Sequence, residues 1–182
     1  MRISLPAALA ASLCAAPALA QVNISTYTDV NLTECSIVST DDMGTTWTCA
    51  GYKGIPVMIA EGDLRFFVSY GLKSTEEKAA SQTLPPFNHL GEKIEWRLGK
   101  ASGELKPVAT ILRYFVSQDE GKPDGEVLVV TKFAPGATCH VAYIDALANP
   151  DANVMAQKAA DETAPEFDCA KDPETIGTFK AW

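Results

Sequence analysis

LRYFVS runs from Leu112 to Ser117, and LRFFVS runs from Leu64 to Ser69, so the chain carries nearly the same hexapeptide twice. Successive side chains of a strand point to opposite faces. In both copies a leucine, an aromatic residue and a valine therefore share one face, and an arginine, a phenylalanine and a serine share the other. Because the phenylalanine beside the arginine needs cover, we expect both hexapeptides to be central strands of an antiparallel sheet.

The repeat has two interpretations. Trp47 lies 17 residues before Leu64, and Trp96 lies 16 residues before Leu112, which indicates a duplicated β–β–β unit with diverged connections. The alternative is coincidence, because strands use a small set of residue types. A duplication predicts that Phe66 and Tyr114 occupy equivalent positions in two superimposable units, and the sequence leaves both interpretations open.

Apolar and alternating runs on either side of the hexapeptides predict further strands. Between them, Ser74 and Glu77 have the spacing of a capping box, which predicts a short surface helix over residues 75–82. Near the C-terminus, Asn149 followed by Pro150 predicts the start of a second helix. Its small-residue face, which would pack on the sheet, comprises Ala152, Met155, Ala156 and Ala159. The expected fold is α+β, with a predominantly antiparallel sheet of about six to eight strands.

The first residues have the pattern of a secretory signal peptide. Arg2 precedes a short apolar run, and residues 18–20 form an A-x-A cleavage site. A lipoprotein signal with Cys14 as the lipidated residue is the less favoured alternative, because Leu13 stands where a small residue is expected. We therefore expect residues 1–20 to be removed, and residues 21–182 to form a single disulfide-stapled domain in the periplasm or outside the cell.

The charge of the chain limits its partners. It has 23 acidic and 15 basic residues, a formal net charge of −8, and cleavage removes one basic residue. An acidic protein is a poor partner for nucleic acid or an anionic membrane, and no later segment has the length and hydropathy of a membrane span. The acidity suits a basic protein partner or simple solubility of a monomer.

Four cysteines remain after cleavage, and an even number in an exported chain indicates two disulfides. Three pairings are possible, and we expect the local one. Cys35 and Cys49 flank a predicted hairpin turn, and Cys139 and Cys169 would join a strand to the segment after the C-terminal helix. No metal site is expected, because there is no C-x-x-C pair and the two histidines are far apart.

No catalytic motif is present in the sequence, and no cofactor is expected. A serine–histidine–carboxylate arrangement would require His89, in a loop, or His140, on a strand. The cysteines are expected to be bridged rather than nucleophilic. A hydrolase using one of these histidines with carboxylates is therefore the alternative to a non-catalytic protein.

The stretch GYKG offers one candidate for binding. It places Tyr52 and Lys53 on a glycine-flanked turn near the first predicted disulfide. An exposed tyrosine on a constrained turn is a common contact residue, although an ordinary turn with the tyrosine folded back is the simpler interpretation.

Two stretches, CHVAYIDALANPDAN…AAD…FDC (139–169) and WTCAGYKGIPV…EGDLRFFVSYG (47–71), resemble small exported bacterial proteins of unknown role. The resemblance implies no activity. The hypothesis from the sequence is a non-catalytic binding or accessory protein of the cell envelope, and its narrower form is an inhibitor of a basic hydrolase such as lysozyme.

Overall fold

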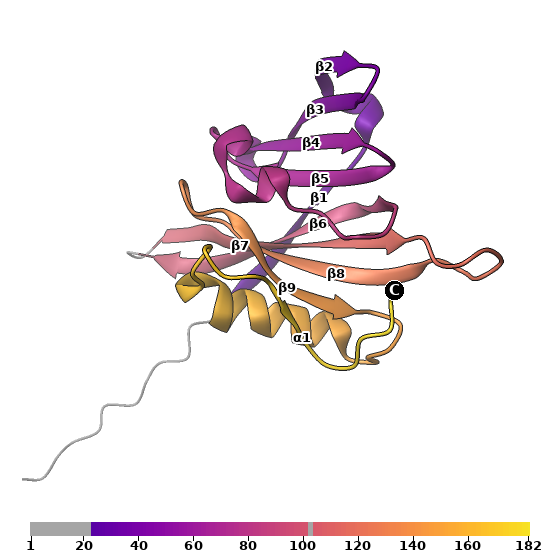
Figure 1. Ribbon diagram of the computed structural model, residues 1–182. Coiled ribbons are helices and arrows are strands. Elements are labelled where there is room, and N and C mark those ends of the chain that lie inside the picture. Colours follow the sequence, from indigo (N-terminus) through magenta and orange to yellow (C-terminus); the bar gives the residue numbers. More distant parts are fainter. Residues whose placement is uncertain (1–22, 102–103) are drawn as a thin grey trace, which may run out of the picture.

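The protein is built in three layers. Its structure, a computed structural model, describes residues 23–101 and 104–182, so the predicted signal peptide lies outside the described residues. Ten strands in this part of the chain form two sheets. In Figure 1 the smaller sheet lies above the larger one, and the C-terminal helix lies below the larger sheet.

The larger sheet has six strands. Their order is β1-β6-β7-β8-β9-β10, and neighbours are antiparallel except for β10, which is parallel to β9. The strands are β1 (Ile24–Asp29), β6 (Asn88–Ala101), β7 (Glu104–Val116), β8 (Gly125–Lys132), β9 (Cys139–Asp145) and β10 (Glu174–Thr175).

The smaller sheet is a four-stranded antiparallel meander. Its strands follow in chain order as β2 (Ser36–Asp41), β3 (Gly44–Ala50), β4 (Pro56–Gly62) and β5 (Arg65–Tyr70). Short 3-10 turns punctuate the chain around it, namely η1 (Leu32–Glu34), η2 (Tyr52–Gly54), η3 (Ser74–Glu76) and η4 (Lys78–Ser81).

One core fills the space between the two sheets. The alternation in β7 turns Leu112, Tyr114 and Val116 toward it, and Val57 and Ile59 of β4 meet them from the smaller sheet. Other buried members include Val68, Tyr70, Leu84, Ile94, Trp96, Val127 and Val129. Both sheets therefore contribute to a single hydrophobic cluster.

A second core lies between the larger sheet and the helix. Strand β8 is apolar on both faces, so Leu128 and Val130 face the helix while their neighbours face the other core. The helix begins as α1 (Ala152–Lys158) and continues through η5 (Ala159–Thr163) and η6 (Ala164–Glu166). Its buried face carries Ala152, Ala156, Ala159, Ala160 and Ala164. The predicted small-residue face is confirmed, and it lets the helix approach the sheet closely. No helix within the described residues is long and apolar enough to cross a membrane.

The two hexapeptides have different environments. LRYFVS is central, in β7 between β6 and β8, as predicted. Residues 65–69 of LRFFVS are in β5, at the edge of the smaller sheet, which corrects the expectation of a second central strand. Leu64 precedes the strand and is exposed. Thr83 and the first residue of β6 cover this edge, because Phe66 N–H donates to Asn88 Oδ1 (3.0 Å) and the Thr83 hydroxyl donates to Phe66 O (2.6 Å).

Strand directions also differ between the two copies. The Trp47 strand β3 and the hexapeptide strand β5 are both antiparallel to β4, so they run in the same direction. The Trp96 strand β6 and the hexapeptide strand β7 are direct antiparallel neighbours. The units are not superimposable in the predicted way, which corrects the hypothesis of a duplication in favour of coincidence.

The α+β class with a mainly antiparallel sheet and a packed C-terminal helix is confirmed, with more strands than expected and a second sheet. Two local details differ. In place of the helix predicted over residues 75–82, the chain forms the two 3-10 turns η3 and η4, and Glu77 between them is extended. Asn149 does not cap the helix with its side chain; it is buried, and its amide bonds to the carbonyls of Asp145 and Thr178.

Candidate functional site

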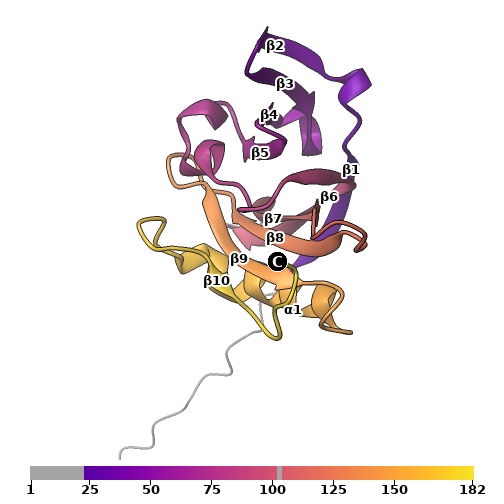
Figure 2. The ribbon, with the colours of Figure 1, turned by 45° about the vertical axis from the view of Figure 1, so that its right-hand side comes forward.

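Three segments enclose a groove beside the junction of the two sheets. They are the η2 turn, the residues between β5 and η3, and the loop between β8 and β9. Figures 1 and 2 both show the β8–β9 loop rising from the larger sheet toward η3 and η4. The groove has a volume of about 510 Å³ and a mainly apolar lining. Its main lining residues are Lys53, Ile55, Pro56, Tyr70, Leu72, Lys73, Phe133 and Pro135.

The η2 turn forms one side of the groove. Gly51 N–H donates to Ile55 O (2.8 Å) and so closes the turn. A Cβ atom on Gly51 would lie 2.5 Å from the Trp96 ring, so only glycine lets the turn approach the core this closely. Lys53 has φ 50°, in the left-handed region, and stands at the exposed tip.

The predicted contact residue Tyr52 is folded back. It is partly buried against the core, and its ring centroid lies 6.3 Å from that of Trp96. The Lys53 ammonium lies 5.3 Å from the Tyr52 ring centroid. The tip of the η2 turn therefore presents the Lys53 ammonium to solvent, while Tyr52 packs between the turn and the core.

Aromatic side chains form the base of the groove. Tyr70 and Phe133 line it, and both meet Trp96 edge to face, at centroid distances of 5.5 and 6.1 Å. Trp96 is fully buried, and its indole N–H donates to Thr28 Oγ1 at 2.8 Å. Burial raises the pKa of Tyr70, so its phenol is neutral at any physiological pH. The base is thus rigid and uncharged.

The β8–β9 loop forms the opposite side, and Glu77 holds it. The Glu77 carboxylate accepts backbone N–H groups from Gly136 (2.6 Å) and Thr138 (2.9 Å). Ala79 N–H donates to Thr138 O (3.1 Å), which adds a third bond between η4 and the loop. Glu77 is buried, so its charge is balanced by these donors rather than offered to a ligand.

The rim combines one apolar side chain with two cations. Leu72 is 92% exposed, more than any other large apolar residue of the described chain. Lys73 Nζ lies 3.4 Å from Glu76 Oε2 in a solvent-exposed pair, and such pairs are weak. Lys53 has no carboxylate within ion-pair distance among the described residues.

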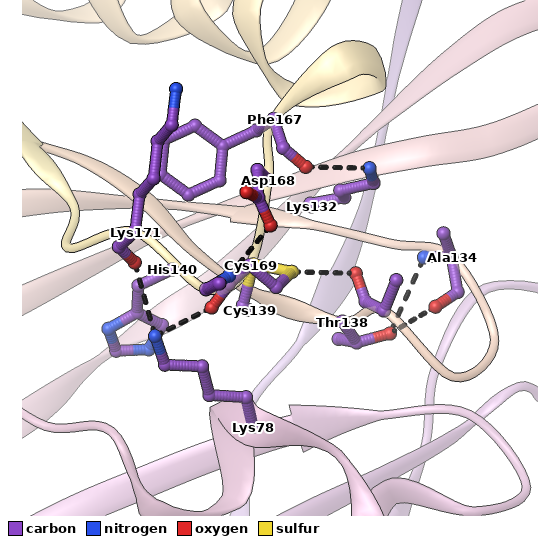
Figure 3. Close-up of a disulfide and its surroundings, with 12 residues drawn as sticks. Lys78, Lys132, Ala134, Thr138, Cys139, His140, Phe167, Asp168, Cys169 and Lys171 are labelled. Carbon is purple, nitrogen blue, oxygen red and sulfur yellow. Dashed lines mark hydrogen bonds between the residues drawn. A yellow bond between two sulfur atoms is a disulfide. The ribbon is translucent and has the colours of Figure 1, made fainter.

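Both predicted disulfides are present. Cys35–Cys49 joins the segment after η1 to β3, and Cys139–Cys169 joins β9 to the segment after the helix. Figure 3 shows the second bridge beside Lys78, whose ammonium donates to the carbonyls of Cys169 (2.6 Å) and Lys171 (3.1 Å). The two disulfides cross-link segments of the fold, and neither of them lines the groove.

The two histidines lie in different environments. His89 is exposed and stacks on Phe115, and its Nδ1 lies 3.9 Å from Asp124. His140 is buried, and its Nδ1 bonds to the Tyr143 hydroxyl at 3.0 Å. Burial lowers the pKa of His140 to about 3. Neither imidazole hydrogen-bonds to a serine hydroxyl in this part of the chain.

No group of three or more His, Cys, Asp and Glu side chains in residues 23–101 and 104–182 could hold a metal ion. Of the two residues proposed from the sequence, Lys53 lines the groove and Tyr52 lies beneath the turn. Sequence reasoning missed Tyr70, Leu72 and Phe133, which come from two distant segments, the end of β5 with the residues after it and the β8–β9 loop. Leu72 had a weak signal, as an apolar residue in the polar turn GLKS.

No protein-family model, curated protein or solved structure matches the chain. The resemblance to small exported bacterial proteins therefore stays a prediction.

Proposed function

We propose that the protein is a non-catalytic binding protein of the cell envelope, and that its groove takes the hydrocarbon part of a small ligand. The observation that carries the proposal is the groove itself. Its volume of about 510 Å³ falls within the range of small-molecule sites, roughly 300–1,000 Å³, which are typically apolar with a few polar groups at defined places.

The framework of the groove supports a preformed site. Gly51 fixes one side against Trp96, and Glu77 fixes the other through two backbone donors. Because these contacts lie within the protein and hold both walls in place, binding would not have to order the walls, which reduces its entropic cost. The two disulfides support a location in an oxidising compartment outside the cytoplasm.

Inhibition of a basic hydrolase such as lysozyme is the narrower hypothesis. The acidic net charge supports attraction to a basic partner. The tip of the η2 turn carries Lys53 rather than a carboxylate, so this turn adds no support. A lysozyme turnover assay with excess mature protein tests the hypothesis, and an unchanged rate would exclude it.

The test of the main proposal is the binding of 11-bromo-1-undecanol, a neutral probe whose bromine quenches tryptophan fluorescence on close approach. We expect saturable binding by calorimetry and quenching of the fluorescence of the mature protein. Leu72→Glu places a charge on the apolar rim and should weaken binding about tenfold, which corresponds to about 1.4 kcal/mol.

Leu147→Glu is the matched control. Leu147 is also exposed, between β9 and α1, and does not line the groove. The Leu147→Glu protein should bind the probe with the same affinity as the unchanged protein. Absence of saturable binding, or equal loss in both variants, would overturn the proposal.

A further inference from the structure

The rim of the groove has a charge opposite to that of the protein as a whole. The chain has a formal net charge of −8, yet the two exposed charged groups lining the groove are Lys53 and Lys73. The third charged residue of the lining, Glu77, is buried and bound to two backbone N–H groups. A ligand at the mouth therefore meets two ammonium groups and one carboxylate that is already bonded.

The position of Lys53 is not explained by the turn alone. Its φ of 50° lies in the left-handed region, which costs a side-chain-bearing residue about 1–2 kcal/mol and is normally given to glycine or asparagine. The next residue, Gly54, also has a positive φ. The lysine contributes no ion pair within the described residues in return. It does contribute an ammonium, 5.3 Å from the Tyr52 ring, at the edge of an apolar groove.

Lys73 lines the same groove from the segment between β5 and η3, next to the exposed Leu72. Its pairing with Glu76 is long and exposed, at 3.4 Å with both side chains about 70% accessible. The ammonium can leave this partner for a ligand at small cost. The aromatic base holds no charged group, so an anion is recognised at the mouth and not in the depth of the groove.

Resting on the proposed function, we propose that the ligand is a single-chain amphiphile with an anionic head group, such as a fatty acid. Its hydrocarbon chain lies against Tyr70, Phe133 and Leu72, and its carboxylate is bound between Lys53 and Lys73. Opposite charge at the mouth and apolar side chains inside match the two parts of such a molecule. No bond is formed or broken, and the ligand is carried unchanged.

The experiment compares 11-bromoundecanoate with 11-bromo-1-undecanol at pH 8, where the carboxyl group is ionised. The two probes share a chain and differ only in the head. We expect the mature protein to bind the carboxylate at least fivefold more tightly. Lys53→Gln/Lys73→Gln should remove this preference, because it deletes both ammonium groups while the apolar side chains of the lining stay in place.

The control is Lys106→Gln/Lys158→Gln, which removes the same charge from two exposed lysines outside the groove. It should keep the preference. Equal binding of the two probes by the unchanged protein, or equal loss of preference in both double variants, would overturn the inference about the head group. Binding of the alcohol alone would still uphold the proposed function, whereas failure of both probes to bind would remove both proposals.

Discussion

At the scale of single residues, the core between the sheets contains a hydroxyl with no partner. Tyr114 is buried in β7, and its Oη has no hydrogen-bond partner among the described residues. Burial, together with the nearby Tyr70 and Tyr143, raises its pKa well above the usual value. The neighbouring tyrosine Tyr143 differs, because its hydroxyl bonds to His140.

We predict that Tyr114→Phe stabilises the protein by about 1 kcal/mol, because a buried polar group without a partner costs roughly 1–3 kcal/mol of desolvation. Urea unfolding measures the change. Tyr143→Phe is the matched control and should instead lower the free energy of unfolding by about 1 kcal/mol, since it removes a hydrogen bond. A destabilised Tyr114→Phe protein would show that the hydroxyl is bonded in solution.

At the scale of elements, the segment carrying η3 and η4 connects the smaller sheet to the β8–β9 loop. The sequence predicted a helix here, with Ser74 as the cap and Glu77 as its reciprocal partner. Glu77 bonds instead to Gly136 and Thr138, some 60 residues along the chain. A long-range contact thus replaced a local one, because the buried Glu77 carboxylate lies beside the loop donors and the N–H of the buried Thr138 required an acceptor.

We predict that Glu77→Gln lowers the free energy of unfolding by about 1.5–3 kcal/mol, the range for a hydrogen bond to a charged group. The side-chain nitrogen of the glutamine cannot accept a hydrogen bond, so one backbone N–H of the β8–β9 loop loses its partner. Hydrogen exchange at Gly136 and Thr138 should become faster. Glu76→Gln, next in the chain but exposed, should change stability by less than about 0.5 kcal/mol. Equal effects of the two changes would contradict this role of Glu77.

At the scale of the whole molecule, stability should depend on pH through His140. This histidine is 1% exposed, and burial lowers its pKa to about 3. Below the ordinary histidine pKa of about 6.5, the unfolded chain binds a proton that the folded protein does not bind until about pH 3. Protonation therefore favours unfolding throughout this window.

We predict that the contribution of His140 to the free energy of unfolding falls by about 1.4 kcal/mol per pH unit as the pH decreases below 6.5. Carboxylates also titrate at lower pH. The free energy of unfolding is therefore measured from pH 7 to pH 5, and its pH dependence is compared between variants. His140→Gln should show a shallower slope than the unchanged protein. The exposed His89→Gln serves as the control, and a slope equal in all three proteins would exclude His140 as the source.

Much of the architecture could be predicted from the sequence. The alternation in β7, the apolar faces of β8, the small-residue face of the helix and both disulfide pairings are confirmed. Each depends on residues close in the chain or on simple periodicity. The candidate site was predicted only in part, because its walls come from η2, the β5–η3 connection and the β8–β9 loop. Lys53 was found because its turn is visible locally, whereas Tyr70 and Phe133 look like ordinary strand and loop residues.

The sequence by itself determined which faces are apolar and where turns interrupt the strands, because these properties follow from neighbouring side chains and backbone preferences. It favoured the local cysteine pairing over two other possible pairings. Only the tertiary structure decided that the strands divide into two sheets, that LRYFVS is central and LRFFVS is at an edge, and that a groove forms beside their junction. The physical reason is that the alternation of side chains between the two faces is the same in both hexapeptides, so it cannot distinguish them. Strand pairing depends instead on which distant strand lies alongside each one. Thr83 and Asn88 complete the edge of β5, whereas β6 and β8 complete β7.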